Sequence, residues 1–419
     1  MRLLRYQKRI PGMRCVYRIS LSLLVLIAAQ LSASGLAAQQ QQQKIRRLDG
    51  SRISAAEAEA FASKTLKEAK VTGAQIAVLN RGRLVWSAAF GLRGRDPDLP
   101  MDRQTTTWAA SITKSVFATY VMILVERGEL QLDTPVEKQL AQPLDHYDAY
   151  KETGSAIVHE TDWPLVTPRM LLSHTSGLLN FASLEPDKKL HLHFKPGTKF
   201  SYSGEGINLV QLVVEQKKQK PIDQLLQEAF FGPLGMSRTG IIYRQEFADN
   251  VADRFDLNEQ FHAKTRRFPA RAAGSMTTSA DDLARFLTAL LGNKLLKRQT
   301  REEMLKPVFA IRTLHQFGQK ENEAEGAEAT AVGLAYGVGW GLLTKTRFGP
   351  AFFKEGHGDG AQNYLICFER SQSCMILLTN SDNGELAFRP LLEKILGNSA
   401  TPWEWEGYTR EYIEASRKN

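Results

Sequence analysis

The chain of 419 residues has only three cysteines and lacks several common enzyme signatures. So few cysteines exclude a disulfide-rich fold, and they make a cysteine-based zinc site unlikely to be the centre of the chemistry. No Gly-x-Ser-x-Gly sequence occurs, which argues against the strand-to-helix nucleophile turn of α/β-hydrolases. No Gly-Lys dipeptide exists for a phosphate-binding P-loop, and His159-Glu160 has no second histidine at position 163.

Basic residues outnumber acidic ones, giving a formal net charge of +9, but the excess is concentrated at the N-terminus. The first 38 residues contain no acid and six basic residues: Arg2, Arg5, Lys8, Arg9, Arg14 and Arg18. The rest of the chain holds 48 basic and 45 acidic side chains, which is nearly balanced. The sequence therefore predicts no basic surface of the kind that binds nucleic acid.

An apolar run from Ile19 to Leu31 follows these cations, and then come small residues and the glutamines 39–43. This is the order of a secretory signal, with a charged region, an apolar region and a cleavage site. The alternative is an uncleaved anchor, because residues 19–38 approach the length that spans a membrane. Both predict export to the periplasm or cell envelope, with membrane association only through residues 19–38.

Two of the cysteines flank a short polar segment between apolar, β-like runs. If those runs form a hairpin, Cys367 and Cys374 could meet across it as a disulfide in an oxidising compartment. Two buried free thiols are the alternative, because the sequence does not give the distance between the two backbones. Cys15 lies in the leader.

Strand patterns occupy both ends of the chain and helical patterns occupy the middle. Gln75–Leu79 and Arg83–Phe90 predict a hairpin. Further strands are predicted over Tyr336–Leu343, Ala351–His357, and Tyr364–Phe368 leading to Met375–Thr379. This order predicts an α/β fold with a mostly antiparallel sheet flanked by helices and an inserted helical region. The sheet is expected from residues 71–100 and 333–397, and the helical region from about 130–300.

Cap signals place several helix ends. Ser54 and Glu57 fit a capping box, Ser279 begins a helix, and Thr167-Pro168 begins another that ends by Gly177. A long apolar helix is expected over Trp108–Arg127, and an acidic, mobile loop over 318–332. The resulting organisation is a signal peptide or anchor (1–38), a linker (39–52), one catalytic domain (53–397), and an aromatic tail (398–419) that docks on this domain or on a partner.

The candidate nucleophile is Ser111, because Lys114 lies three residues later on the expected helix. Positions i and i+3 share a helix face, so the lysine nitrogen can reach the serine oxygen. A serine hydroxyl needs such a base, and lysine can serve if burial and nearby cations lower its pKa. Near the helix start, the Ser111 N–H is also free to bind an oxyanion. A Ser-x-x-Lys spacing is too common to stand alone, but this is its single occurrence here.

Further motifs follow in a consistent order, and they are Leu171-Leu-Ser-His-Thr-Ser-Gly-Leu178, Pro196-Gly-Thr-Lys-Phe-Ser-Tyr-Ser203, Pro233-Leu-Gly-Met236, the run 273–283, and Glu355-Gly-His-Gly-Asp-Gly360. With Ser111 and Lys114, they resemble the serine β-lactamase-related hydrolases, which include class C β-lactamases, D-Ala-D-Ala carboxypeptidases and related esterases. The resemblance runs from about residue 53 to 397. It implies a catalytic role for Tyr202, whose phenol would shuttle protons after a nearby cation lowers its pKa. His174 is interpreted as structural.

Two departures from the family pattern bear on the substrate. Gly204 stands where Tyr-x-Asn would place an amide, and the third motif, often Lys-Thr-Gly, reads His357-Gly-Asp359. Glu355, His357 and Asp359 are expected on one strand face, and the Gly360 N–H is expected as second oxyanion donor. A mostly neutral histidine beside two acids predicts neutral or cationic substrates rather than carboxylates.

The sequence thus predicts a Ser-Lys-Tyr serine hydrolase that needs no metal or organic cofactor. It would cleave an ester, amide or peptide bond of a small-molecule or peptide substrate, as an esterase or D-amino-acid peptidase or carboxypeptidase does. The alternatives are a β-lactamase, and a penicillin-binding envelope protein that is acylated without turnover.

Overall fold

A computed structural model describes residues 44–317, 326–409 and 411–413. The predicted leader, Cys15 and the glutamine run lie outside the described residues. Within the described part of the chain, no helix has the length and apolar character needed to cross a membrane.

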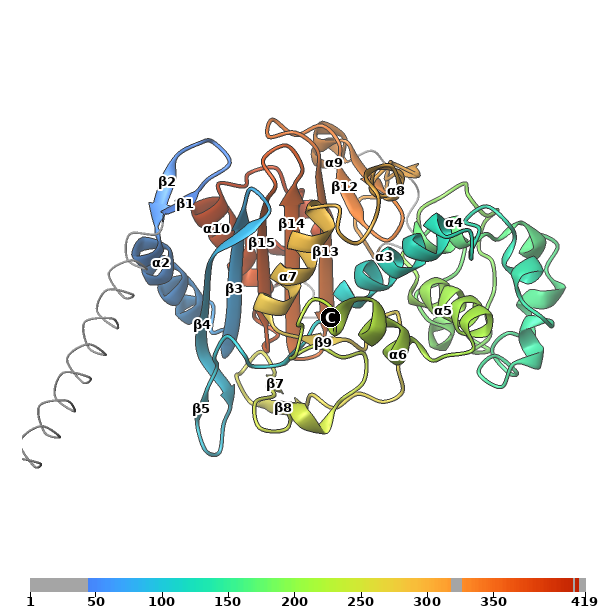
Figure 1. Cartoon of the computed structure of the whole chain (residues 1–419), viewed down its shortest axis with the longest axis horizontal. Helices are drawn as coiled ribbons and strands as arrows, with labels where there is room; N and C mark the ends of the chain where they lie inside the picture. The colour runs from blue at the N-terminus through green and yellow to red at the C-terminus, as the bar shows by residue number, and fades with distance from the viewer. Residues whose placement is uncertain (1–43, 318–325, 410, 414–419) are drawn as a thin grey trace, which may run out of the picture.

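A nine-stranded antiparallel sheet forms the centre of the fold, in the order β10-β11-β12-β13-β14-β15-β3-β4-β5 (Figure 1). Its strands are β3 (Gly73–Asn80), β4 (Arg83–Gly94), β5 (Leu99–Pro100), β10 (Phe309–Ala310), β11 (Leu334–Tyr336), β12 (Gly341–Leu343), β13 (Ala351–Gly358), β14 (Ala361–Phe368) and β15 (Ser373–Thr379). Both ends of the chain supply strands, which confirms the predicted fold class. The single strand expected over 336–343 is wrong, because the chain turns at Gly339, whose φ is +79°, and makes two short strands.

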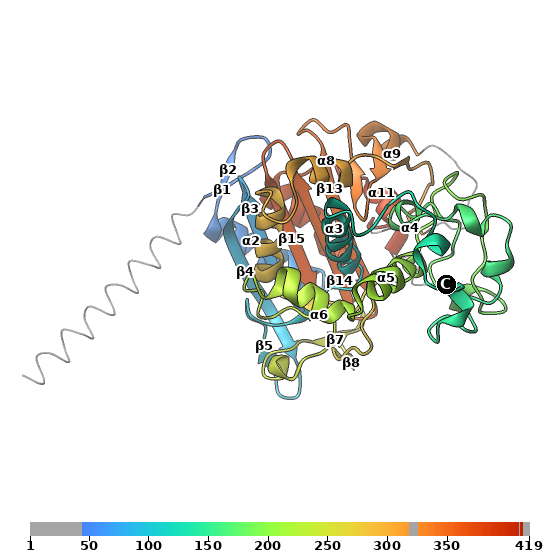
Figure 2. The same ribbon diagram turned by 45° about the vertical axis from the view of Figure 1, so that its right-hand side comes forward.

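Helices cover both faces of this sheet (Figures 1 and 2). On one face lie α2 (Ala55–Glu68), α10 (Glu385–Leu391), η8 (Leu392–Leu396) and α11 (Trp403–Glu406); on the other lie α3 (Ile112–Glu126), α7 (Ala280–Leu291) and α8 (Arg298–Met304). The alternation of strand side chains follows from this layering. Ile76 and Val78 pack in the core beneath α2 and α10, whereas Ala77 and Leu79 pack in the core beneath α3 and α7. The central strands are therefore apolar on both faces.

The helical region lies to one side of the sheet, and α3 runs between the two parts (Figure 1). It contains α4 (Pro168–Leu172), α5 (Gly204–Lys218), α6 (Ile222–Leu226), the π-helix η6 (Gln227–Phe231), and the short 3₁₀ turns η1 (Val136–Gln139), η2 (Leu144–His146), η3 (Ile157–His159), η4 (Trp163–Leu165), η5 (Ala182–Leu184) and η7 (Gln245–Phe247). Two small ribbons complete this part, β6 (Thr107–Trp108) with β9 (Thr277–Thr278), and β7 (Asp253–Phe255) with β8 (Phe261–Lys264).

Helix starts follow the cap residues. The Ser54 capping box with Glu57 is confirmed, and Ser279 accepts a hydrogen bond from the Asp282 N–H at the start of α7. Helix α3 is shorter than expected, because Thr107–Trp108 pairs as a strand and Ala110 adopts a φ of +45°. The helix consequently begins directly after Ser111.

Three segments differ from their predicted roles. Part of the expected linker is folded, since β1 (Lys44–Arg46) pairs with β2 (Arg52–Ser54) and buries Ile45. Part of the expected loop 318–332 is helical as α9 (Ala327–Val332), while residues 318–325 lie outside the described residues. The aromatic tail docks on the domain itself, with Trp403 and Trp405 buried against the sheet through α11.

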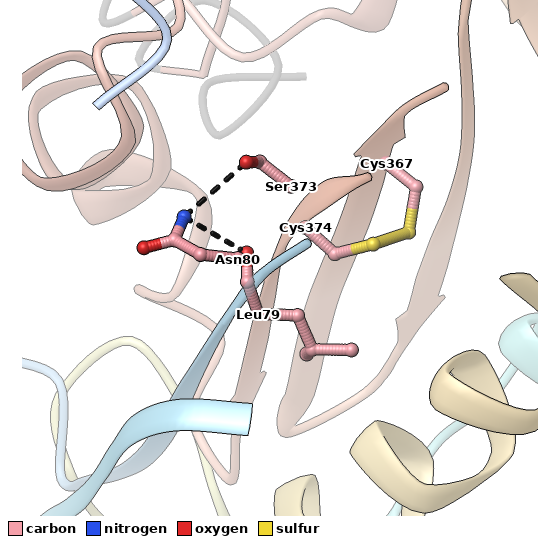
Figure 3. The surroundings of a disulfide bond; sticks show 5 residues. All are labelled: Leu79, Asn80, Cys367, Ser373 and Cys374. Carbon is pink, nitrogen blue, oxygen red and sulfur yellow. Dashed lines mark hydrogen bonds between the residues drawn. A yellow bond between two sulfur atoms is a disulfide. The ribbon is translucent and has the colours of Figure 1, made fainter. Parts of the chain in front are cut away.

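A disulfide joins Cys367 and Cys374 (Figure 3). The two residues face each other across β14 and β15, with Cα atoms 4.1 Å apart. Next to it, the Asn80 side chain donates hydrogen bonds to Ser373 Oγ at 3.2 Å and to Leu79 O at 3.1 Å. The disulfide, one of the two alternatives left by the sequence, is the one the structure contains.

The docked tail gives a stability prediction. The Trp405 ring packs near Phe200 and Phe353, each at 6.3 Å between ring centres, and its Nε1 donates to Thr313 Oγ1. Trp405→Ala should therefore lower the free energy of unfolding by about 3–5 kcal/mol in urea denaturation. Tyr412→Ala is the control, because that ring is 42% exposed and should cost under about 1 kcal/mol. Equal, small losses in both variants would show that the tail is not part of the core.

Candidate active site

Ser111 and Lys114 meet at the first turn of α3, as the spacing predicts. Lys114 Nζ donates to Ser111 Oγ at 2.8 Å and to the Ala273 carbonyl at 2.5 Å. The serine stands at the helix N-cap and the lysine is 1% exposed. The pair thus has the geometry of a nucleophile and its base.

The environment of Lys114 favours its neutral form. Burial, and then the positive charge of Lys354, hold the pKa of Lys114 well below its usual range, although Glu355 acts in the opposite direction. A neutral amine can accept the serine proton, whereas an ammonium group cannot.

Tyr202 joins the pair from the loop before α5. Its neighbour Ser203 caps α5, accepting from the Gly206 N–H, and this fixes the loop. The Tyr202 hydroxyl shares a hydrogen bond with Ser111 and accepts one from Lys354 Nζ at 3.0 Å. Burial raises the pKa of Tyr202 to about 12 despite the nearby lysine, so the expected lowering is wrong. The phenol is protonated and can pass a proton on.

Lys354 is a candidate functional residue that the motifs in the sequence did not indicate. Its side chain, on β13, is fully buried between Tyr202 and Glu355, and hydrogen-bonds to both. Burial alone would lower its pKa, but the Glu355 carboxylate holds the pKa of Lys354 well above its usual range. The sequence carried a signal, because Lys354-Glu355-Gly356 differs from Lys-Thr-Gly at one position.

Strand β13 presents an open edge beside the nucleophile. β12 pairs with it only over Ala351–Phe353, so from Lys354 onward this edge has no strand partner among the described residues. Two glycines bring the strand close to the chain ahead of Ser111. A Cβ at Gly356 would lie 2.3 Å from the Ala109 carbonyl, and one at Gly358 would lie 2.2 Å from the Trp108 ring.

The other third-motif residues make contacts that lead away from Ser111. His357 Nδ1 lies 2.6 Å from Glu385 Oε1, Asp359 lies in the turn after β13 with its side chain 84% exposed, and the Gly360 N–H donates to Asp382. Asp359 therefore does not share the strand face of Glu355 and His357, contrary to expectation. The oxyanion role of Gly360 stays a prediction, and its N–H is engaged in this structure.

The charge of His357 also differs from expectation. Burial disfavours the imidazolium, but the hydrogen bond and charge of Glu385 outweigh it, and the pKa of His357 lies above its usual value. A mostly neutral histidine was the basis for expecting neutral or cationic substrates, so that argument loses its support.

His174 packs against Tyr202 and hydrogen-bonds to the loop that carries it. The helix α4 ends at Leu172, and His174 follows with a φ of +59° rather than sitting in the last turn. Its Nδ1 accepts from the Ser203 N–H at 3.1 Å, and its ring lies 4.3 Å from the Tyr202 ring. Burial and the two lysines keep the pKa of His174 well below its usual value. A neutral imidazole thus holds the catalytic loop.

Neighbouring side chains account for Gly204. Its N–H donates to Asn180 Oδ1 at 2.8 Å, and a Cβ on this residue would lie 2.8 Å from the Phe181 ring. The space beside position 204 is already filled, so an asparagine there would not fit without movement.

No group of three or more histidine, cysteine, aspartate or glutamate side chains in the described residues is arranged to hold a metal ion.

Comparisons with known proteins agree with this geometry. A family model described as Beta-lactamase matches residues 58–396. Esterase EstB of Burkholderia gladioli is 27% identical over 332 residues, covering 68% of this chain and 78% of that protein. Some other curated relatives are matched over a smaller part of their length, such as 63% of protein Rv1367c of Mycobacterium tuberculosis. The octameric penicillin-binding protein homologue from Pyrococcus abyssi has the same fold, with a TM-score of 0.66, 22% identity, and coverage of 86% of this chain and 80% of that one.

Lys354→Met tests whether the charge of Lys354 lowers the pKa of Lys114. Removing this charge should raise the pKa of Lys114, because its protonated form is no longer repelled. Lys114 acts only when neutral, so the acidic limb of the pH profile of kcat/KM for an ester should move to higher pH.

Lys345→Met is the matched control, because this lysine is exposed just after β12, and it should leave the acidic limb of the pH profile in place. Because the variant leaves Glu355 without its partner, the double variant with Glu355→Gln is measured too. An unmoved limb in both Lys354 variants would contradict the proposed tuning.

Proposed function

Because the chain belongs to the β-lactamase family of serine hydrolases, we propose that it is an exported enzyme that forms an acyl-enzyme at Ser111 and cleaves an ester, amide or peptide bond. The observation that carries this proposal is the continuous set of hydrogen bonds from Lys114 through Ser111 and Tyr202 to Lys354. The pKa directions of Lys114, Tyr202 and Lys354 favour a neutral amine, a neutral phenol and a charged ammonium group, which are the states that acyl transfer requires.

Acylation follows from these states. Ser111 Oγ attacks the substrate carbonyl carbon while its proton moves to the neutral Lys114 amine. The Tyr202 hydroxyl gives a proton to the leaving group as the carbonyl–leaving-group bond breaks, and the proton that Lys114 took from Ser111 replaces it, so that the site neither gains nor loses a proton. The charged Lys354 stabilises negative charge on the phenolic oxygen during this transfer.

Deacylation uses the same groups in reverse. Water attacks the acyl carbon while its proton passes to the neutral Lys114 amine, and the bond from the acyl carbon to Ser111 Oγ breaks as a proton returns to that oxygen. The Ser111 N–H at the helix start is the first oxyanion donor. No part of this cycle calls for a redox step.

The open edge of β13 favours a substrate with an amide-like or extended backbone. Such a chain can add to a free strand edge through main-chain hydrogen bonds. The relative named esterase EstB supports ester cleavage, and the likeness to a D-amino acid amidase of Ochrobactrum anthropi, at 20% identity, supports amide cleavage only through its fold. β-Lactams, as cyclic amides, remain the alternative substrate class.

Export is supported by two observations. The N-terminal order of charges, apolar residues and small residues is that of a secretory signal. The disulfide between Cys367 and Cys374 is of a type that persists in oxidising compartments such as the periplasm.

Acylation without turnover is a second candidate function. It is favoured by the Gly360 N–H, which donates to Asp382 and so is not free to bind an oxyanion. A site with one donor occupied could form the acyl-enzyme yet release it slowly.

Ser111→Ala should reduce hydrolysis of 4-nitrophenyl acetate to the rate without enzyme, because no other hydroxyl shares the Lys114 amine in the described site. Ser115→Ala is the control on the same helix, since Ser115 Oγ only donates to Gly339 O and should retain activity. Undiminished activity in Ser111→Ala would disprove the assignment. A single burst of nitrophenol with a stable adduct on Ser111, seen by mass spectrometry, would favour acylation without turnover.

Tyr202→Phe keeps the packing on His174 and removes only the hydroxyl. It should lower kcat by about 10²- to 10⁴-fold, the range for loss of a proton-transfer group. Tyr120→Phe is the control, because it removes a hydroxyl from another buried ring, which packs on Phe230 and not on Lys354 or Lys114. Equal effects of the two substitutions on kcat would refute proton transfer by Tyr202.

A further inference from the structure

The indole of Trp108 is fixed at the end of the open edge of β13. It belongs to β6, three residues ahead of Ser111, and its Nε1 donates to the Gly274 carbonyl at 2.6 Å. Its ring packs directly on Gly358, the last residue of β13. The Trp108 indole is therefore held in a fixed position close to the nucleophile.

Two arginines lie over this indole. The guanidinium carbon of Arg267 is 3.4 Å from a Trp108 ring centre, and that of Arg254 is 5.0 Å away. Arg254 belongs to β7 and Arg267 follows β8, so the small ribbon brings both to the same place. Each residue is partly exposed.

Two carboxylates act on these charges without pairing directly with them, Asp359 on both arginines and Asp382 on Arg254. Among the described residues neither arginine makes an ion pair, and Arg254 donates instead to the Asp359 carbonyl oxygen at 2.6 Å, while its buried Nε has no hydrogen-bond partner. The Asp359 carboxylate is mostly exposed and lies 3.9 Å from His262. Burial and then repulsion by Arg254 lower the pKa of Arg267 to about 10. A bound anion would offset both costs.

The proposed proton transfer by Tyr202 defines which way the substrate lies along the open edge of β13. Tyr202 and Lys354 lie at one end of the open edge, and Trp108 and Gly358 lie at the other. Since Tyr202 protonates the leaving group, the leaving group lies at its end. The acyl part then extends toward Trp108.

We propose that Arg254 and Arg267, held on Trp108, bind a carboxylate at the far end of the acyl part, so that the enzyme prefers monoesters or monoamides of dicarboxylic acids. A guanidinium fork and a carboxylate form paired, charge-assisted hydrogen bonds. This inference rests on the proposed acyl-enzyme chemistry and reverses the expectation of neutral or cationic substrates, because the ribbon brings in charges that the third motif does not contain.

The kinetic test compares 4-nitrophenyl monoesters of succinic, glutaric and adipic acid with neutral esters of equal chain length. The wild-type enzyme should prefer the charged member of at least one pair. Arg267→Gln should lower that ratio of kcat/KM values by about 10- to 100-fold, the range for losing a hydrogen bond to a charged group. Arg266→Gln is the matched control, because Arg266 is exposed and stacks on Tyr243 instead, and it should keep the ratio.

A binding measurement separates this proposal from the proposed function. Calorimetry with Ser111→Ala should detect the monomethyl esters of the same diacids, and the double variant Ser111→Ala/Arg267→Gln should bind them at least about 10-fold more weakly. If the wild type cleaves no ester, the proposed function fails while this measurement still decides the anion site. An unchanged ratio in Arg267→Gln, or no binding of any diacid monoester to Ser111→Ala, would overturn the inference.

Discussion

Two buried lysines share one phenol and one carboxylate, and this shared environment sets the chemistry of the site. Lys114 Nζ and Lys354 Nζ lie 5.0 and 4.9 Å from the centre of the Tyr202 ring. Two unit charges no more than about 10 Å apart repel by at least roughly 1.5 kcal/mol at an effective dielectric constant of about 20. The Glu355 carboxylate bonds to Lys354 and keeps that lysine charged. The cost of burial and repulsion therefore falls on Lys114, which is left as the base.

The fold supplies the rigidity that this arrangement needs. Ser111 is fixed by the start of α3, Tyr202 by the capped start of α5, and Lys354 by the central strand β13. The sheet is buried on both faces, so the strand that carries Lys354 cannot shift register without exposing apolar side chains. Glycines at 356 and 358 let this strand approach the nucleophile. Packing and chemistry thus depend on the same few contacts.

Local signals predicted what depends on local structure. The hairpin of β3 and β4, the caps at Ser54 and Ser279, and the pair Ser111–Lys114 follow from spacing and cap chemistry. The start of α3 was misplaced, because pairing of Trp108 with Thr277 is a contact between distant segments. The pair of arginines over Trp108 was missed for the same reason, since Arg254 and Arg267 reach that residue only through tertiary structure. The net pKa of Tyr202 depends on burial, which a motif does not reveal.

The division of charge between the two lysines is the central claim, and nitrogen-15 NMR of the lysine side chains tests it most directly. Lys114→Met and Lys354→Met spectra would assign the two buried signals. At neutral pH, the Lys114 Nζ should show the chemical shift of a neutral amine and the Lys354 Nζ that of an ammonium group. Two ammonium signals, or a neutral Lys354 beside a charged Lys114, would contradict the account.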